Sequence, residues 1–379
     1  MKVRSLWSAA GAGVLAAVSL GVIGAGTPAS AAGPVAPAAV MAPAASTAAS
    51  WEATQIPLEQ SAGDVTLTPD GKKAYVPVNK GVRADGDGEA GVAVIDTATG
   101  KTVTTIANER GGFDDRAVMS PDGKSLYTAS WDGVTVIDTA TDTVRSYIPA
   151  PGAPNGGGML TDIAVDAGGL LYILEDAQVM PGGRWVSVVD PATGSVISSY
   201  SDPRGGSVSA EARMAVSPDG NHVYINNAAG PLDYESFFSL DTTSRQWQVH
   251  SIGATAHRGS AAGSIALSPD GSRLYLWAAS GAGTGLHEVE TATMTPKLIN
   301  SASTGALHIS RDGKTLYAAT ADANGAGFME VDTSSFSIRS TASAEIEFVR
   351  SLTASPEGGH VYAVNRAVEE FQITDFTRS

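Results

Sequence analysis

The feature that most constrains this chain is a phrase that recurs seven times along it. Each copy has an apolar run, then a turn of the Ser/Thr-Pro-Asp-Gly kind, and then an apolar residue followed by tyrosine. The seven tyrosines lie 42 to 52 residues apart, and they are Tyr75, Tyr127, Tyr172, Tyr224, Tyr275, Tyr317 and Tyr362. A period of this length is typical of an array that repeats one small structural unit.

Each copy of the phrase predicts a tight hairpin. Proline presets φ at the first turn position, aspartate accepts hydrogen bonds within the turn, and glycine adopts positive φ. A second phrase, such as VIDTATG ending at Gly100 or VVDPATG ending at Gly194, predicts a third strand and another turn. A further β-rich run, such as residues 101–106, supplies a fourth strand. We therefore predict an all-β fold, a seven-bladed β-propeller with four-stranded blades, over residues 51–379.

The two ends of the repeat array indicate how the ring closes. The last repeat stops after its third strand, near residues 370–376, and the strand-like run 52–59 precedes the first repeat. We expect this N-terminal strand to pair into the last blade as its fourth strand. Closure of this kind removes an exposed sheet edge that would otherwise template aggregation.

The segment before the repeats has the composition of an export signal and a linker. Two basic residues precede an apolar run, and small residues around Ala29 fit a signal-peptidase site. We predict a signal peptide over residues 1–31 and an Ala/Pro-rich disordered linker over residues 32–50. The mature protein is then secreted, either extracellular or associated with the cell wall.

Charge and composition narrow the range of partners. The net charge is −15, and the chain has no cysteine. A negative surface repels phosphate backbones, and no later apolar stretch reaches the roughly 20 residues that span a bilayer. We therefore expect no nucleic-acid binding and no membrane insertion. We expect a monomer whose partner is a small molecule, an extracellular protein or a cell-wall ligand.

The two phrases together resemble the YVTN-type β-propeller repeats of exported prokaryotic proteins, within a lactonase-like superfamily. The resemblance rests on the apolar-Tyr pairs, such as Leu-Tyr, and on Val-Ile-Asp-Thr-Ala-Thr-Gly, and it covers residues 51–379. The resemblance is highly specific for the propeller fold and poorly specific for an activity. Similar proteins include surface-layer modules and periplasmic binding proteins, and more distant relatives include lactonases and propeller subunits of amine dehydrogenases.

The short turns are expected on one face of the ring, which we call the turn face. The long, varied connections lie on the opposite face, which we call the loop face, and such loops commonly carry function. Five residues before each turn proline, one position per blade is expected at the channel mouth on the loop face. Its occupants are Asp64, Arg116, Asp162, Arg213, Ser264, Ala306 and Ser351. Four consecutive blades thus alternate acid and base.

Two hypotheses follow from this ring of charges. In the first, Arg116, Arg213 and Arg350 hold an anionic ligand, with Asp64 and Asp162 beside them. In the second, the opposite charges pair between blades and hold the inner strands in register.

A second ring lies three residues after each tyrosine, and we expect it to face the first around the same opening. Its polar members include Glu175, Asn227 and Asn365. We predict no cofactor from a motif, but Glu175, Asp162 and Asn227 offer the oxygen ligands that Ca²⁺ or Mg²⁺ prefers.

Catalytic candidates are few. His257 stands in a long connection on the loop face and could act as a general base, with Glu175 as a second candidate. His308 occupies a first-strand position filled by Ala or Thr in most other blades. We expect an exported binding or interaction protein that uses the loop face and channel mouth. The alternatives are a lactonase- or lyase-type enzyme, using a divalent metal or a histidine base, and a cell-surface scaffold.

Overall fold

The computed structural model describes most of the predicted propeller. It covers residues 50–58, 61–80, 89–108, 116–130, 132–152, 158–177, 183–205, 208, 212–227, 236–252, 264–280, 283–366 and 371–379. These residues all belong to one compact unit, residues 45–379. The predicted signal peptide and all but the last residue of the predicted linker lie outside the described residues.

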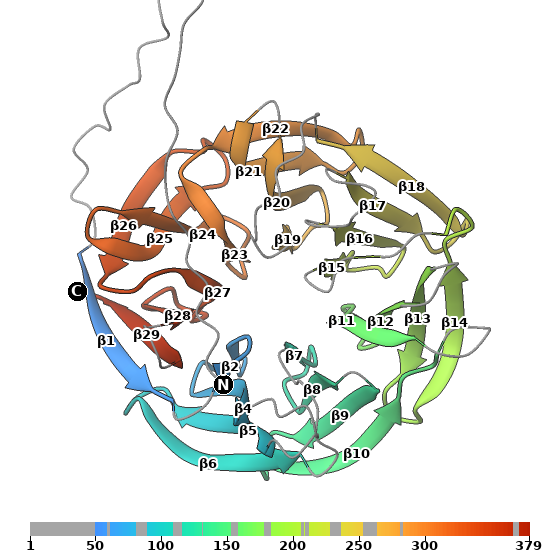
Figure 1. The fold of residues 1–379 in the computed structure, drawn as a ribbon, viewed down its shortest axis with the longest axis horizontal. Helices are drawn as coiled ribbons and strands as arrows, with labels where there is room; N and C mark the ends of the chain where they lie inside the picture. Colours follow the sequence, from blue (N-terminus) through green and yellow to red (C-terminus); the bar gives the residue numbers. More distant parts are fainter. Residues whose placement is uncertain are drawn as a thin grey trace, which may run out of the picture. The chain divides into compact units, whose positions relative to one another are not determined.

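Seven antiparallel sheets stand side by side in a ring (Figure 1), which confirms the seven-bladed β-propeller. We number the blades 1 to 7 in chain order. Blade 1 is β2 (Ser61–Ala62) with β3 (Thr66–Leu67), β4 (Lys73–Lys80), β5 (Glu89–Asp96) and β6 (Lys101–Asn108). Blade 2 is β7 (Arg116–Met119), β8 (Ser125–Ser130), β9 (Gly133–Asp138) and β10 (Thr143–Pro149). Blade 3 is β11 (Met159–Val165), β12 (Leu171–Asp176), β13 (Arg184–Asp190) and β14 (Ser195–Ser201).

The remaining blades follow the same plan. Blade 4 is β15 (Arg213–Val216), β16 (His222–Asn226), β17 (Ser236–Asp241) and β18 (Gln246–Ser251). Blade 5 is β19 (Ile265–Leu267), β20 (Arg273–Ser280), β21 (Gly283–Glu290) and β22 (Thr295–Asn300). Blade 6 is β23 (Ser303–Ile309), β24 (Thr315–Asp322), β25 (Gly325–Asp332) and β26 (Ile338–Ala344). Blade 7 is β27 (Val349–Ala354), β28 (His360–Arg366), β29 (Phe371–Arg378) and the N-terminal β1 (Trp51–Pro57). No helix occurs in the described residues, so none of them forms a helix that could span a membrane.

The apolar core lies between the blades. Seven hydrophobic clusters are present in the described part of the chain, and each combines residues of two adjacent blades. Each repeated tyrosine is buried in one of them, from Tyr75 between blades 1 and 2 to Tyr362 between blades 7 and 1. A single blade therefore has no core of its own, which explains why the tyrosine recurs in every repeat.

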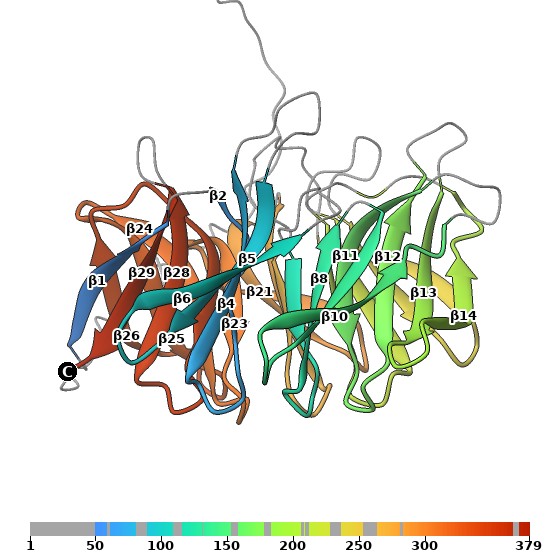
Figure 2. The same cartoon turned by 90° about the horizontal axis from the view of Figure 1, so that it is seen from below.

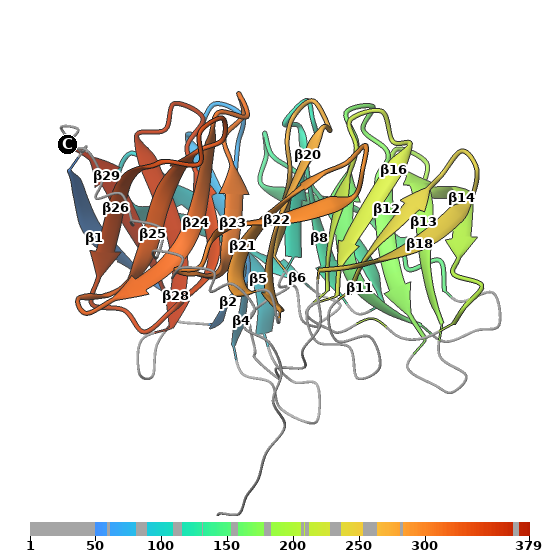
Figure 3. The same cartoon turned by 90° about the horizontal axis from the view of Figure 1, so that it is seen from above.

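The repeated turn is held by its own side chains on the turn face (Figures 2 and 3). In blade 2, the Ser120 hydroxyl donates to Asp122 over 2.7 Å and accepts the amide of Ser125 over 2.9 Å. Gly123 adopts φ +71°. The Thr139 hydroxyl, from the second phrase, donates to the carbonyl of Gly123 over 2.6 Å. The two phrases recur together because the second one ties its turn to the first.

The turn glycine also packs against the preceding blade. A Cβ on Gly123 would lie 2.6 Å from Cγ of Pro69, the turn proline of blade 1. The same contact, at 2.9 to 3.2 Å, joins Gly71 to Pro356, Gly271 to Pro218 and Gly313 to Pro269. At four blade interfaces the proline ring of one turn thus wedges against the glycine of the next, and we call this contact the proline wedge.

The ring closes as predicted, because β1 pairs with β29 in antiparallel register from Trp51↔Arg378 to Pro57↔Gln372. Side chains reinforce the closure across to blade 6. The Trp51 indole donates to the Ser340 hydroxyl over 3.0 Å, and Ser340 and Arg378 both donate to the carboxylate of Glu330. Both ends of the propeller are therefore anchored at one buried acid.

The proline wedge predicts a difference between two glycine substitutions. Gly123 and Gly194 have nearly the same φ, +71° and +70°, but nothing lies within 4 Å of a Cβ placed on Gly194. We expect Gly194→Ala to lower the free energy of unfolding by about 1 kcal/mol through backbone strain alone. Gly123→Ala should cost a further 1–3 kcal/mol or so, because Pro69 must move. Urea unfolding of both variants measures the difference, and equal losses would show that the wedge contributes nothing.

Candidate functional site

The channel mouth contains a cavity of about 310 Å³ whose walls come from the first strands of six blades. Its polar and charged lining comprises Asp64, Arg213, Ser264, His308, Arg350 and Ser351, together with two threonines. The rest of its wall consists of aliphatic side chains. We call this space the mouth cavity.

Arg116 is a central member of the predicted ring of charges, but it does not line the mouth cavity. Its side chain is only 4% exposed and lies between two acids of neighbouring blades. Its Nη1 is 3.2 Å from Oδ2 of Asp64, and its Nε is 3.3 Å from Oδ1 of Asp162. Asp162 in turn accepts the amide of Met214 over 2.6 Å. Four consecutive blades are thereby tied together, as in the ion-pairing hypothesis.

The environment of Asp162 explains why this arrangement needs Arg116. Burial raises the pKa of Asp162, whereas the Arg116 guanidinium and the Met214 amide act to lower that pKa. Burial outweighs these contacts and raises the pKa of Asp162 to about 7, so the charge and hydrogen bonds from the two neighbouring blades offset only part of the cost of burying the carboxylate.

Arg213 and Arg350 have a different environment from Arg116, since both line the mouth cavity. Arg213 donates to the carbonyl of Ala212 over 3.3 Å, and no acid among the described residues lies within ion-pair distance of it. Arg350 donates to the carbonyl of Ala62 over 3.4 Å. It is the extra residue at a register shift, because Val349 and Ser351 pair with the adjacent residues Asn365 and Val364. A bulge of this kind re-aims a side chain, here toward the cavity.

His308 lies deeper in the channel. It lines both the mouth cavity and a second cavity of about 410 Å³ that extends to the turns around Pro69 and Pro356. Burial lowers the pKa of His308 to about 4, and the nearest polar contact of its Nδ1 is the Thr353 hydroxyl at 3.5 Å. Its imidazole is thus neutral near pH 7 and can accept a proton.

The second predicted ring does not reach the mouth cavity. Glu175, Asn227 and Asn365 are all at most 1% exposed, and none of them lines that cavity. They belong to second strands or their ends, which are covered by neighbouring blades on both sides. We expected the two rings to face one another around the opening, but the structure does not place the polar residues of the second ring there.

Glu175 illustrates how these buried polar groups are satisfied. Its Oε1 accepts the Gly152 amide over 2.9 Å, and its Oε2 accepts the Trp185 indole over 2.7 Å. Burial raises the pKa of Glu175, and these hydrogen bonds act against that rise. Asn365 is satisfied only in part: its side-chain amide donates to the Thr374 hydroxyl over 2.6 Å, whereas its buried Oδ1 has no hydrogen-bond partner among the described residues.

The remaining candidates divide into two groups. His257 lies outside the described residues, so its place as a general base stays a prediction. For the predicted Ca²⁺ or Mg²⁺ site, no group of three or more histidine or acidic side chains suited to a metal occurs within the described ranges. His308 was a weaker candidate in the sequence than His257 or Glu175. The one signal that pointed to it is that most other blades carry Ala or Thr at the same repeated position.

Comparison with known proteins supports the architecture. The model of a family described as "Lactonase, 7-bladed beta-propeller" matches residues 276–379, a segment that includes His308 and Arg350. No curated protein shows significant similarity to the chain. Among solved structures, Kuenenia stuttgartiensis hydrazine synthase superposes with a TM-score of 0.61 at 15% identity, covering 86% of this chain and 98% of that chain. At that identity the likeness shows the fold alone. The chain is a seven-bladed β-propeller that is similar, over its C-terminal part, to the lactonase family.

The contrast between the two arginines of the first ring predicts effects of different size on stability. Arg116→Ala leaves the carboxylate of Asp162 buried without its counter-charge, so we expect the free energy of unfolding to fall by about 3–5 kcal/mol. Arg213→Ala removes a partly exposed side chain and should change it by less than about 1 kcal/mol. Thermal and urea unfolding of the two variants test this, and a neutral Arg116→Ala would refute the structural role of the ion pairs.

Proposed function

We propose that this protein is an exported binding protein that takes a small organic anion into the mouth cavity. The observation that carries the proposal is the difference between the three arginines near the mouth. Arg116 is held by two acids, whereas Arg213 and Arg350 line the cavity and donate to backbone carbonyls. A guanidinium has five N–H donors, and the one hydrogen bond that Arg213 donates among the described residues leaves it donors for a ligand. Arg350 adds a second positive charge to the cavity wall.

The size and charge of the site support an anionic metabolite. A volume of about 310 Å³ lies at the small end of ordinary ligand pockets, so the ligand is small. The chain carries a net charge of −15, whereas the mouth cavity is lined by two arginines and one acid, Asp64, which forms an ion pair with Arg116. Aliphatic walls lower the local dielectric and strengthen a guanidinium–carboxylate pair.

The binding proposal predicts the effect of removing the two guanidinium groups. We expect Arg213→Ala and Arg350→Ala each to weaken binding of a small carboxylate at least tenfold, because each removes a charge-assisted hydrogen bond of about 1.5–3 kcal/mol. Calorimetric titration with succinate, citrate and gluconate, used as probes, measures the effect. Arg145→Ala is the matched control, because Arg145 lies on an outer strand and donates to Ser125. Unchanged affinity in both mouth variants would contradict the proposal.

A second candidate function is hydrolysis of a small lactone, and the match of residues 276–379 to the lactonase family favours it. In this form of the hypothesis, Arg213 and Arg350 hold an acidic group of the substrate. His308 acts as the general base, taking a proton from water as the water oxygen attacks the lactone carbonyl and the ring C–O bond breaks. The divalent-metal form of the hypothesis uses a bound Ca²⁺ or Mg²⁺ in place of this base.

The enzymatic hypothesis predicts a specific pH dependence. Because the pKa of His308 is lowered to about 4, its base form is present above that pH, and kcat/KM should fall as pH drops through about 4. His308→Asn should abolish turnover without changing the affinity of the carboxylate probes. A screen of acidic lactones by pH-stat, with and without EDTA, is the measurement. Turnover that His308→Asn leaves intact would exclude the histidine base, and loss of turnover in EDTA would favour the metal.

A further inference from the structure

A third cavity lies on the turn face between blades 6 and 7. It has a volume of about 780 Å³, larger than the mouth cavity. The charged side chains of its lining are the three arginines Arg311, Arg339 and Arg378 and the three acids Asp312, Glu330 and Glu357, and Tyr317 lies among them. We call this space the turn-face cleft.

The proline wedge is missing at the interface that holds the cleft. Five of the seven repeated turns carry proline at the wedge position, but blade 6 carries Arg311 there. The glycine of the next turn, Gly358, consequently has no ring against it. A Cβ on Gly358 would meet only the hydroxyl of Tyr317, at 3.3 Å.

Blade 3 also lacks proline at the wedge position, and other side chains occupy the space there. Its wedge position is Ala167, and there Tyr172 donates to the carbonyl of Gly220 over 3.1 Å while Asp166 packs against the same glycine. The interface between blades 3 and 4 is thereby closed by the protein's own groups. Tyr317 is the equivalent of Tyr172 in blade 6, and it is 3% exposed. Its hydroxyl makes no hydrogen bond with any residue that the structure describes, and it faces the cleft.

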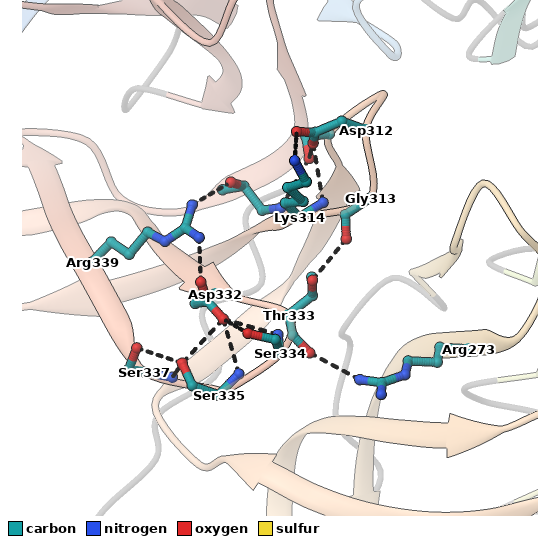
Figure 4. A network of polar contacts seen from close by, with 12 residues as sticks. Arg273, Asp312, Gly313, Lys314, Asp332, Thr333, Ser334, Ser335, Ser337 and Arg339 are labelled. Carbon is teal, nitrogen blue, oxygen red and sulfur yellow. Dashed lines mark hydrogen bonds and ion pairs between the residues drawn. The ribbon is translucent and has the colours of Figure 1, made fainter.

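Two arginines of the cleft are fixed in place by acids behind them. Arg339 donates to Asp332 and to the Thr315 hydroxyl, as Figure 4 shows for Asp332. Arg378 donates to Glu330 and stacks over Trp51, with 4.6 Å from its Cζ to the ring centre. The acids are the better buried partners, since the exposed fractions are 44% for Arg339 against 18% for Asp332, and 38% for Arg378 against 4% for Glu330. The exposed ends of both ion pairs are therefore cationic.

Arg311 adds a third positive charge to the same cleft. Its side chain is exposed, and no described residue accepts a hydrogen bond from its guanidinium or forms an ion pair with it. The acid of the same turn, Asp312, is engaged by Ser310 and Lys314 within that turn. Glu357 is the acid at the opposite rim of the cleft.

We propose that the turn-face cleft is a second ligand site, which binds the oxyanion group of a small solute, a carboxylate or a phosphate. The Arg311 guanidinium binds two oxygens of the group in a fork, and the Tyr317 hydroxyl donates to it. Arg339 and Arg378 supply the surrounding positive potential. The cleft shares no lining residue with the mouth cavity, so the two can be tested with separate variants.

The test restores the missing wedge. Arg311→Pro places in blade 6 the residue that five other turns already carry, and the backbone bonds of this turn, from Gly313 to Ser310 and from Ser310 to Thr315, do not involve the Arg311 amide. We therefore expect this variant to fold with an unchanged or higher Tm. Lys314→Gln is the matched control, because it removes the same charge from the same turn but does not line the cleft.

Equilibrium dialysis with radiolabelled inorganic phosphate and, separately, labelled citrate at constant ionic strength gives the readout. Arg311→Pro should lose one bound equivalent of at least one probe relative to the wild-type protein, and Lys314→Gln should lose none. The probe that is lost identifies the oxyanion as phosphate or carboxylate. Tyr317→Phe should weaken the same equivalent at least fivefold, which keeps the test valid if Arg311→Pro does not fold.

Variants of the two sites separate the two proposals. The double variant Arg213→Ala/Arg350→Ala should keep the equivalent that Arg311→Pro loses, whatever the mouth cavity binds. If only the mouth variant loses binding, the turn-face site is refuted and the proposed function stands. If only Arg311→Pro loses binding, the turn-face site stands and the mouth proposal falls. Full binding of both probes by Arg311→Pro and by Tyr317→Phe also refutes the turn-face site.

Discussion

The packing of each blade against the next is the constraint on which the rest of this structure depends. All seven apolar clusters of the described residues lie between blades, so no blade can bury its own core and the ring has to close. Closure is made by β1 on β29 and by Glu330, which receives Ser340 and Arg378. Because Trp51 donates to Ser340, the start and the end of the propeller are held at the same carboxylate. The contacts that close the ring therefore also stabilise the fold.

Contacts between neighbouring blades hold the strands in register around the channel. Between blades 1 and 4, Arg116 and Asp162 form a continuous chain of ion pairs and hydrogen bonds. From blade 4 to blade 6 uncharged groups continue it: Asn226 donates to the carbonyls of Ser264 and Trp277, and the Trp277 indole donates to the carbonyl of Ser303. The proposed sites use one member of the repeated ring, Arg213, which has no ion pair with a described acid, and two arginines that depart from the repeat, Arg350 in the mouth and Arg311 on the turn face.

The sequence predicts the fold because the repeated residues report local geometry. The turn glycine and the buried tyrosine recur in all seven blades and the turn aspartate in five of them, so the copies determine blade number, strand order and ring closure. The sites are harder to predict, since they depend on single departures. The direction of Arg350 follows from a bulge in β27, and the buried position of Glu175 follows from packing on both faces of its strand. The cleft at Arg311 requires knowing that a proline ring normally touches a glycine of the next blade, which is a contact between turns about 45 residues apart in sequence.

The claim that the arginines lining the two cavities, and not the ion-paired Arg116, form the ligand sites is tested most directly by anomalous diffraction from bromide-soaked crystals. Bromide reports every accessible cationic site without assuming a ligand. The account predicts bromide in the mouth cavity beside Arg213 and Arg350, and in the turn-face cleft beside Arg311, with none at Arg116. Bromide bound at Arg116 with Asp64 or Asp162 displaced, or a mouth cavity without bromide, would contradict it.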